Sequence, residues 1–423
     1  MAKLLKVLKT LRNHWKKSTL AAVLLSYGTN YLHDKYRTTQ LMRAYCEEAR
    51  KYGEEPLPIG SKPRHITVIL NPTSKDGKGK TLYEKYAAPI LHLAGMKVSI
   101  IQTEQAGQAR DLLEIMNNTD AVIIAGGDGS LHEAVTGLFR RPDADFVSTH
   151  LPLGIIPIGK SNSVARKLFT TSTTLEAERL AEAAMSVIKQ VTKPMDVMRI
   201  EGERGRPVYA VSKLEFGAFR DTEETISKYW YFGPLKKRMA YIFSAIRKWP
   251  PASEIYLSYL SPCSGCSKCY VSAPPSVTPQ HRRWWEVFLP RGPTKEAPPM
   301  KDYSNITNDN CGVWKEEEWL CLNLDIKTKN VESEELTEEA MTVNILPSDC
   351  SRTNFIHQGV SRQNEEISTP NTGCRKIHAR VLQLTPSVQE GEERWYSVDN
   401  DNYEVQPVKV ELLSKKLYMY CRQ

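Results

Sequence analysis

A carboxylate set among three glycines is the clearest chemical signal in the chain. The apolar run 122–125 ends in a glycine-rich turn, and a helix is expected after it. The turn consists of Gly126, Gly127, Asp128, Gly129 and Ser130. Glycines let backbone N–H groups approach an anion closely, and the helix N-terminus adds a favourable dipole. The pattern predicts a phosphate-binding turn with Asp128 as the catalytic candidate, and an ordinary strand-to-helix turn is the alternative.

Three further loops follow apolar runs that read as buried strands. The run 66–70 leads into a turn rich in glycine and lysine at 71–80, the run 98–101 ends at 103–109, and 153–156 leads into 157–166. Strand–loop–helix repeats stack into a parallel sheet whose loops converge at the C-terminal ends of the strands. One nucleotide could therefore contact all four loops.

In this order the four loops resemble those of the diacylglycerol kinase and sphingosine kinase family of lipid kinases. The Asn-Pro turn at 71–72, the Thr-Glu segment at 103–104 and the Pro-x-Gly-x-x-Asn pattern at 157–162 carry the resemblance. The glycine motif alone is also shared with NAD kinases and phosphofructokinases. The resemblance implies nucleotide-binding roles for Asn71, Pro72, Gly77, Lys78, Thr103, Gly126, Gly127, Gly129, Ser130, Gly159, Ser161 and Asn162.

The fourth loop departs from the family pattern. It carries Lys160 and Ser161 where the family usually has Thr-Gly, and Ser163 where an aspartate is usual. The added lysine could pair with a phosphate or point to solvent, as loop lysines ordinarily do. Asn162 matches the pattern.

The segment 396–404 lies where the family carries an Asp-Gly-Glu motif. Here Asn400 and Asp401 stand in place of the glycine and the glutamate. The resemblance makes Asp401 a second catalytic candidate, with a reach shorter by one methylene, and Asp399 a candidate metal-site or structural residue. An acidic hairpin turn that faces solvent is the alternative.

One more aspartate resembles a substrate-binding residue. The segment around Asp221 is similar to the sphingosine kinase segment whose aspartate addresses the polar head of the substrate. The resemblance implies that Asp221 binds the acceptor hydroxyls. A surface salt bridge to Arg220 or Lys228 is the alternative.

Length and periodicity predict two domains in the 423 residues. The strand–loop–helix pattern predicts an α/β nucleotide-binding domain with a parallel sheet at 62–195. From Asp196 the period-two alternation predicts antiparallel sheet, and the resemblance implies a lipid-substrate β-sandwich at 196–423 with the active site between the domains. The resemblance lapses at about 260–313, so we expect a mobile insertion there.

The N-terminal segment 1–33 is basic, amphipathic and free of acidic residues. The segment carries six positive charges of the formal net charge of +8, so the rest of the chain is nearly neutral. This pattern favours mitochondrial targeting or an anionic lipid surface over nucleic-acid binding. The apolar stretch 20–28 is shorter than the roughly 20 residues that a spanning helix needs, so membrane association is expected rather than spanning.

The nine cysteines are too sparse for a disulfide framework, and free thiols are the default expectation. Cys263, Cys266 and Cys269 have a spacing that could begin a zinc or iron–sulfur site. A clear second group of ligands at a usual interval does not follow them.

The sequences of the segments 11–17 and 89–96 most resemble those of mitochondrial members of the family. The resemblance implies an ATP-dependent, Mg²⁺-assisted kinase that converts mono- and diacylglycerol to lysophosphatidic and phosphatidic acid. It also implies a location at the mitochondrial inner membrane, facing the intermembrane space, and association with the carrier translocase of that membrane. A sphingosine or ceramide kinase and a catalytically inactive interaction subunit are the alternatives.

Overall fold

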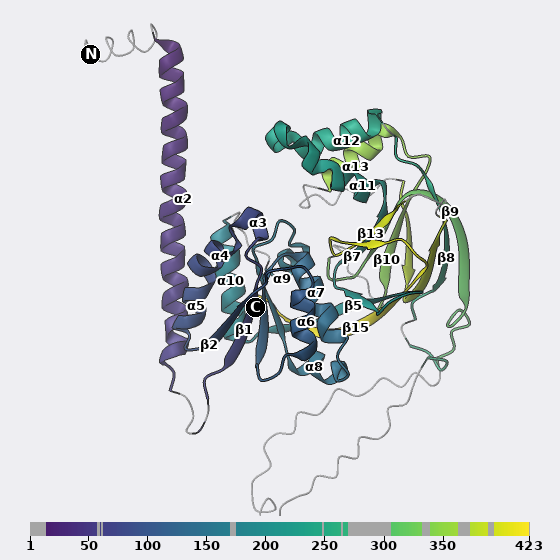
Figure 1. Ribbon diagram of the computed structural model, residues 1–423, viewed down its shortest axis with the longest axis horizontal. Coiled ribbons are helices and arrows are strands. Elements are labelled where there is room, and N and C mark those ends of the chain that lie inside the picture. The colour runs from purple at the N-terminus through teal and green to yellow at the C-terminus, as the bar shows by residue number, and fades with distance from the viewer. Residues whose placement is uncertain are drawn as a thin grey trace, which may run out of the picture.

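The computed structural model describes residues 14–56, 60, 62–169, 175–247, 249–263, 265–269, 306–331, 339–362, 373–387 and 393–422 (Figure 1). The helices are α2 Trp15–Glu54, α3 Ser74–Gly77, α4 Gly79–Leu82, η1 Tyr83–Ala87, α5 Ala88–Leu93, α6 Gln108–Ile115, α7 Asp128–Phe139, α8 Ala144–His150, α9 Ser163–Leu168, α10 Glu176–Lys189, α11 Ala218–Thr225, η2 Ile226–Leu235, α12 Lys236–Arg247 and α13 Arg352–Ser361. The strands are β1 His65–Leu70, β2 Lys97–Gln102, β3 Ala121–Gly126, β4 Leu153–Pro157, β5 Thr192–Gly202, β6 Val208–Ala210, β7 Lys213–Gly217, β8 Ser253–Leu260, β9 Trp314–Lys327, β10 Met341–Pro347, β11 Arg375–Ala379, β12 Val381–Pro386, β13 Trp395–Val398, β14 Asp401–Glu404 and β15 Val408–Tyr420.

The N-terminal half is built on parallel strands in the spatial order β4-β3-β1-β2. Every residue of β3 is buried, as expected for a parallel strand covered by helices on both faces. The chain adds β2 on one side of β1 and β4 on the far side of β3, so the order reverses between β1 and β3. Loops that leave a sheet at such a point diverge and form a crevice outside the strand ends. The loops after β1 and β3 are therefore the natural walls of a binding site.

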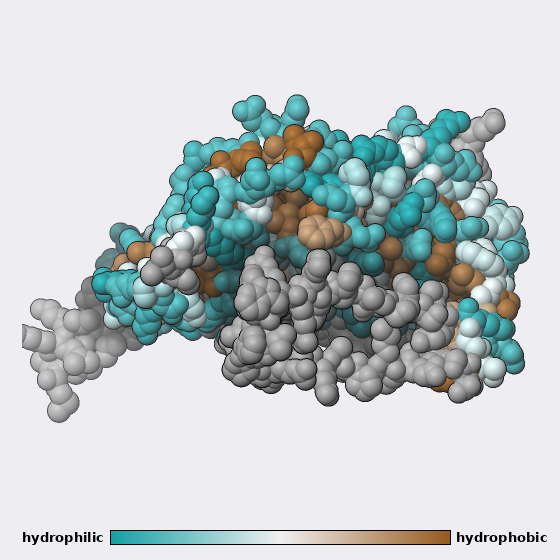
Figure 2. Space-filling model, turned by 90° about the horizontal axis from the view of Figure 1, so that it is seen from below, coloured by the Kyte–Doolittle hydropathy of each residue, from teal (hydrophilic) through white to brown (hydrophobic). Residues whose placement is uncertain are grey.

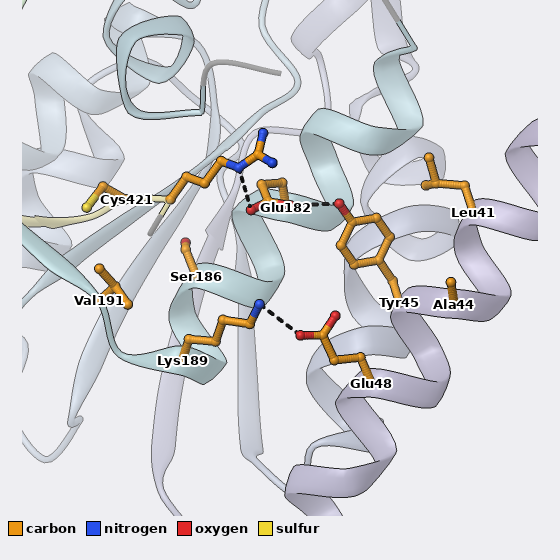
Figure 3. Close-up of a pocket in the computed structure, with 10 residues that line it drawn as sticks. Leu41, Ala44, Tyr45, Glu48, Glu182, Ser186, Lys189, Val191 and Cys421 are labelled. Atoms are coloured by element: carbon orange, nitrogen blue, oxygen red, sulfur yellow. Dashed lines mark hydrogen bonds and ion pairs between the residues drawn. The ribbon is translucent and has the colours of Figure 1, made fainter. Parts of the chain in front are cut away.

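The C-terminal part of the long helix α2 packs against α10 of this half (Figure 3). The Tyr45 hydroxyl donates a hydrogen bond to Glu182 of α10 at 2.6 Å, and Lys189 pairs with Glu48 at 2.8 Å. Ala49 is fully buried in the same contact. Figure 1 shows the N-terminal part of α2 extending beyond the rest of the fold, and large side chains such as Leu25 and Tyr27 are exposed there.

The C-terminal half consists mainly of antiparallel strands around a second hydrophobic core. Strands β7, β8, β9, β12 and β15 pair in the order β7-β9-β8-β12-β15. Alternate residues of β8 and β12 face this core, which is the period-two burial that the sequence predicts. The expected α/β half followed by an antiparallel half is therefore confirmed, whereas the boundary at 195/196 stays a prediction.

One strand joins the two halves into a single sheet. The first part of β15 pairs with β12, and its end runs parallel to β4, with Met419 opposite Leu153. The pairing of β15 with β5 is interrupted between Leu413 and Leu417, and Lys415 in this bulge has a φ of 54°. Asp196 Oδ1 accepts a hydrogen bond from the backbone N–H of Lys415 at 2.9 Å. The carboxylate thereby holds the bulge at the junction of the halves.

A small group of helices, α11, α12 and α13, covers one end of the antiparallel half (Figure 1). The rings of Phe219 and Phe355 stack with centroids 5.0 Å apart, and Tyr241 packs edge-on against both. These three side chains are almost completely buried. The helices therefore have a core of their own.

A buried charge cluster ties α13 to the sheet beneath it. The guanidinium of Arg362, just after α13, pairs with Glu215 of β7 and, at 3.0 Å, with Asp325 of β9. Lys213 and Lys327 lie on the same two carboxylates at 2.8 and 3.1 Å. Burial alone would raise the pKa of Glu215, but Lys213 and Arg362 hold that pKa far below its usual value. The Glu215 carboxylate therefore stays ionised inside the fold.

The surface seen from below is largely hydrophilic, with hydrophobic residues in separate patches (Figure 2). Among the described residues, no helix combines the length and the apolar character needed to cross a membrane. Of the expected insertion at about 260–313, residues 270–305 lie outside the described part of the chain, as do residues 1–13 of the basic N-terminal segment.

Candidate functional site

A cavity of about 510 Å³ lies at the C-terminal ends of β1, β3 and β4. The turn between β13 and β14 closes it from the antiparallel half. Nine of the residues expected to bind nucleotide or to act in catalysis line this cavity. They are Asn71, Thr103, Gly127, Asp128, Gly129, Ser130, Gly159, Ser161 and Asp401. Pro72, Gly77, Lys78, Gly126, Asn162, Asp221 and Asp399 do not line it.

Asn71 fixes the first loop to the start of α7. Its side-chain amide donates to Ser130 Oγ at 3.2 Å, and its Oδ1 accepts from the N–H and the hydroxyl of Thr73. Pro72 lies between these partners in the chain. The loop backbone then turns so that Lys75, Asp76 and Gly77 have positive φ values of 52°, 59° and 82°. Non-glycine residues adopt this conformation only when their surroundings hold it, so the loop is a specifically built feature.

Ion pairs hold the strained part of the first loop from two sides. Lys75 pairs with Glu176 at the start of α10, and Asp76 pairs with Lys160 of the fourth loop at 2.7 Å. Lys78 ends α3 through a backbone hydrogen bond to Lys75. Lys160 thus bridges two loops at an exposed position on the rim. It lines the cavity, where a phosphate group could compete for it.

Glycines in the turn 126–130 and in the fourth loop allow backbone and side chains to approach one another closely. A Cβ on Gly127 would lie 2.8 Å from the carbonyl oxygen of Ser161, and one on Gly159 would lie 2.3 Å from the Gly127 Cα. A Cβ on Gly126 would meet Ser130, and one on Gly129 would meet the Asp401 carboxylate at 2.9 Å. Only glycine fits at these positions without displacing the neighbours.

The fourth loop is closed on itself by Asn162. Its Oδ1 accepts from the Gly159 N–H at 3.2 Å, and its Nδ2 donates to the Gly159 carbonyl at 2.9 Å. The match of this asparagine to the lipid kinase pattern therefore has a local structural explanation. The Lys160 and Ser161 substitutions do not disturb this closure, because both side chains point to other partners.

Asp128 is turned toward the fourth loop. Its side chain is only 3% exposed, and Oδ2 accepts hydrogen bonds from the Ser161 hydroxyl at 2.6 Å and from the Ser163 hydroxyl and N–H at 2.7 and 2.9 Å. The two serines that depart from the family pattern are thus the partners of this carboxylate. Its Oδ1 is buried without a hydrogen-bond partner in the described part of the chain.

We expect Asp128→Ala to weaken both the fold and nucleotide binding. Three partly buried donors would lose their acceptor, at a total cost of about 1–3 kcal/mol in the free energy of unfolding. The KM for ATP should rise because the fourth loop loses its anchor. Urea unfolding and ATP titration of initial rates test this. A fall in kcat with unchanged stability and unchanged KM would instead assign Asp128 to the proton transfer alone.

The second loop reaches the cavity beside α7. The backbone N–H of Thr103 donates to the Leu70 carbonyl at 2.9 Å, which sets this loop against the end of β1. The backbone N–H of Gly107 donates to Glu133 of α7 at 2.8 Å. Glu133 lines the cavity and was not among the expected site residues. Its position four residues after Gly129, on the same face of α7, is the signal that could have identified it.

Asp401 projects into the cavity from the first position of β14. Burial, followed by the negative charges of Glu133 and Asp399, raises the pKa of Asp401 to about 6. A carboxyl group with such a pKa is ionised at neutral pH and is basic enough to accept a proton from an alcohol as the alcohol reacts.

Asp399 has a different environment from Asp401, although the two are separated by a single residue. Its carboxylate accepts hydrogen bonds from the backbone N–H groups of Val211, Ser212 and Lys213 and from the Ser212 hydroxyl. It is 2% exposed, and its backbone φ is 47°. Both carboxylate oxygens thus hold the turn that presents Asp401. The expected metal role of Asp399 stays a prediction.

Helix α7 and the β13–β14 hairpin are also joined below the cavity. The buried His132 forms a 2.8 Å hydrogen bond through Nε2 with the hydroxyl of Tyr403 on β14. Burial lowers the pKa of His132 to about 4, so the ring is neutral at physiological pH. The contact holds α7, and with it the glycine turn 126–130, at a fixed distance from Asp401.

Asp221 lies on α11, outside this cavity. Its carboxylate is 51% exposed and pairs with Arg220 at 2.9 Å, which is the salt bridge that the sequence left as the alternative. Arg220 also pairs with Glu224 at 3.0 Å. If Asp221 contacts the lipid substrate, it would contact the part of the lipid that extends out of the cavity.

The donors and acceptors in the cavity suit a nucleoside triphosphate. The N-terminus of α7 and the lysines Lys75 and Lys160 supply positive potential along one wall. Glu133 and Asp401 supply carboxylate oxygens, the ligands that a hard divalent cation takes. Burial is the main cause of the raised pKa of Asp401, and a cation at Glu133 would relieve the repulsion from Glu133 that adds to it.

Comparison with known proteins identifies the class to which this fold and cavity belong. Residues 65–200 match the diacylglycerol kinase catalytic domain, and residues 211–423 match the acylglycerol kinase C-terminal region. The chain is thus a lipid kinase, for which ATP is the implied co-substrate. It belongs to the acylglycerol kinase family.

The family assignment rests on relatives that match along the whole chain. The mitochondrial acylglycerol kinase of Xenopus laevis is 37% identical over 422 residues, covering 100% of this chain and 96% of that protein. The Homo sapiens protein of the same name is 37% identical over 415 residues, covering 98% and 96%. Human ceramide kinase is 31% identical over 205 residues, which cover 45% of this chain and 36% of that protein.

A solved structure shares the fold. A putative diacylglycerol kinase from Bacillus anthracis str. Sterne superposes with a TM-score of 0.51 and 16% sequence identity, covering 85% of this chain and 97% of the other. At this identity the likeness concerns the arrangement of the two halves and carries no information on substrates.

Proposed function

We propose that this lipid kinase transfers the γ-phosphoryl group of ATP to mono- and diacylglycerol, giving lysophosphatidic and phosphatidic acid. The observation that carries the proposal is the cavity in which the glycine turn of α7 meets Asp401 from the opposite half of the chain. Relatives matched over nearly the full length and named acylglycerol kinase support the choice of acceptor.

The nucleotide phosphates would lie against the N-terminus of α7. The N–H groups of Gly129 and Ser130 belong to the first turn of this helix, where backbone donors have no partner within the helix. Lys75 and Lys160 would exchange part of their present ion pairing for the phosphate charge. Asn71 and Asn162 would act indirectly, by keeping the first and fourth loops closed.

Glu133 would hold Mg²⁺ together with the nucleotide phosphates, which leaves the Asp401 carboxylate available to the acceptor hydroxyl. Bound there, the ion neutralises charge that develops on the phosphoryl oxygens. A site with few protein carboxylates is typical of Mg²⁺, which keeps several of its waters. We include Glu133 in this proposal because it lines the cavity and its charge acts on Asp401.

The acceptor hydroxyl would give its proton to Asp401. This carboxylate enters the cavity from the antiparallel half, faces the helix turn and has a pKa of about 6. Asp128 remains a candidate through Oδ1 alone, because three donors occupy Oδ2. We therefore expect Asp401 to contribute more to kcat and Asp128 more to the shape of the nucleotide site.

The lipid would approach from a surface formed by η2 and the start of α12. Trp230 is 75% exposed there, and Tyr231 and Leu235 are also exposed. The basic residues Lys236, Lys237 and Arg238 follow directly. Lys160 lowers the pKa of Asp76 in the loop 71–80, and the charge of Lys236 lowers it further. Lys236 therefore lies near this loop. Exposed aromatics beside basic residues are suited to an anionic membrane surface.

We propose a mitochondrial location at the inner membrane, facing the intermembrane space, with the basic segment 1–33 as the targeting or attachment element. Deleting residues 1–33 should abolish mitochondrial localisation of a tagged chain. The deletion should leave the kinase fold intact, because α2 is docked through Tyr45 and Glu48, which the deletion retains. Fluorescence microscopy and the thermal midpoint measure the two effects. Normal import of the shortened chain would contradict the targeting role.

The substrate proposal is tested by ATP-dependent phosphorylation of monoacylglycerol, diacylglycerol, sphingosine and ceramide in mixed micelles at one Mg²⁺ concentration. We expect product from the two acylglycerols. Preference for sphingosine or ceramide would contradict this proposal and favour a sphingosine or ceramide kinase, the activities for which two relatives are named. Binding of ATP without phosphorylation of any of the four lipids would favour the interaction subunit, for which the carrier translocase is the predicted partner.

A further inference from the structure

Four cysteines from two separate stretches of the chain meet beyond the end of the β8–β9 hairpin. Their sulfur atoms all lie within 4.8 Å of one another. Three belong to the segment after β8, namely Cys263, Cys266 and Cys269, and the fourth is Cys311, just before β9. Sequence spacing identified the first three and missed the fourth, because residues 270–310 separate it from them.

We propose that these four cysteines form a structural site for one Zn²⁺ ion. A zinc ion bound at about 2.3 Å to four thiolates in a tetrahedron separates the sulfurs by roughly 3.8 Å. The Cys266 and Cys269 sulfurs are 3.6 Å apart, and the Cys269 and Cys263 sulfurs are 3.9 Å apart. Two of the sulfur–sulfur distances thus match a mononuclear site, and all the others lie within 4.8 Å.

The same distances disfavour the two other uses of four cysteines. A four-iron cluster places a cube of iron and sulfide between its thiolates and holds their sulfurs further apart than a single ion does. A disulfide requires sulfurs about 2.05 Å apart, and all four cysteines are free thiols here. Soft thiolates in a compact tetrahedral arrangement are typical zinc ligands.

The polypeptide around the sulfurs is organised as a metal-binding turn. The backbone N–H of Cys266 donates to the Cys269 sulfur at 3.3 Å, and the Asn308 side-chain amide donates to the Cys263 sulfur at 3.4 Å. Such donors stabilise the negative charge of thiolate ligands and orient them. Cys266 is completely buried, and Lys268 supplies a positive charge within the turn.

Hydrogen bonds to backbone carbonyls join the two segments independently of the sulfurs. The N–H of Ser267 donates to the Ile306 carbonyl at 2.8 Å, and Lys268 Nζ donates to the Asp309 carbonyl at 3.5 Å. Within the second segment, the N–H of Cys311 donates to the Asn308 carbonyl at 3.2 Å. Just beneath, Leu260 of β8 pairs with Trp314 of β9. A metal at this point would close the long connection between the strands and hold their register. Four protein ligands leave no open position, so the role is structural.

The test is metal analysis of the full-length chain purified without added metal and without chelator. We expect inductively coupled plasma mass spectrometry to find about one zinc ion per chain. Exchange with Co²⁺ should give the visible absorption of a tetrahedral thiolate site. Cys311→Ser should lose the absorption and most of the zinc, whereas Cys350→Ser, a free cysteine outside the cluster, should retain both.

Two measurements on the unsubstituted protein keep the proposal falsifiable if Cys311→Ser fails to fold. X-ray absorption at the zinc edge should report four sulfur neighbours at about 2.3 Å. Removal of the metal by a chelator should lower the thermal midpoint, and zinc should restore it. Iron in place of zinc, fewer than three sulfur neighbours, or a metal-free protein with these cysteines oxidised in pairs would each overturn it.

Discussion

Replacing Asp401 with asparagine is expected to lower kcat for lipid phosphorylation by about a hundred- to ten-thousand-fold. A positioned general base contributes an effect of this size, and the amide keeps the shape of the side chain while losing its basicity. The contact with the N-terminal turn of α7 should persist, because asparagine occupies the same space beside Gly129. Initial rates at saturating ATP and lipid measure the change.

Glu404→Gln is the matched control, because Glu404 lies on the same strand β14 and is exposed outside the cavity. It should retain nearly full activity. If Asp401→Asn kept more than about a tenth of the activity, the proton would have to go elsewhere, and Asp128 Oδ1 would become the leading acceptor.

The pH profile gives a second signature of Asp401. Burial, followed by the charges of Glu133 and Asp399, raises the pKa of Asp401 to about 6, and only the ionised form can accept a proton. We therefore expect kcat/KM to be level above this pH and to fall up to about tenfold per unit below it. The residual activity of Asp401→Asn should lack this fall. An identical acidic limb in the variant would show that another group titrates.

Replacing Arg362 with methionine is expected to lower the free energy of unfolding by about 3–5 kcal/mol, the largest stability effect that we foresee. The substitution keeps much of the apolar volume over the Phe219 ring but removes the charge. It leaves Glu215 and Asp325, which are 1% and 4% exposed, with one lysine each. Urea unfolding followed by tryptophan fluorescence measures the loss.

A surface ion pair in the same half provides the comparison. Arg375 pairs with Glu317 at 3.5 Å and is 55% exposed, so Arg375→Met should change the free energy of unfolding by less than about 1 kcal/mol. Adding Glu215→Gln and Asp325→Asn to the Arg362 variant should restore part of its stability, because the carboxylates would no longer be charged. Equal effects of the two arginine variants would contradict the burial argument.

The α/β half could be predicted from the sequence because its signals are local. Apolar runs such as 66–70 and 122–125 each become a buried strand, and the loop that follows each run reaches the cavity. The pairing of the end of β15 with β4 could not be predicted in this way, because it joins Met419 to Leu153 across most of the chain. Nothing in either segment alone specifies this contact.

The site was predictable in its residue types more than in their contacts. The glycine turn, Asn71 and Asp401 were identified from motifs, and all of these except Gly126 line the cavity. The orientation of Asp128 toward Ser161 and Ser163 depends on how two loops pack, which spacing cannot reveal. Asp399 likewise received its partners from Val211, Ser212 and Lys213, a distant part of the chain.

The strand β15 has a consequence for the order in which the protein can be completed on the ribosome. Leu417, Met419 and Tyr420 belong to the hydrophobic core of the nucleotide-binding half, yet they are synthesised only after strands β5 to β14. A nascent chain that has emerged only as far as β5 therefore has an open sheet edge at β4. Expression of residues 62–200 alone would produce this same incomplete half, whereas supplying the β15 segment in trans offers a way to complete it.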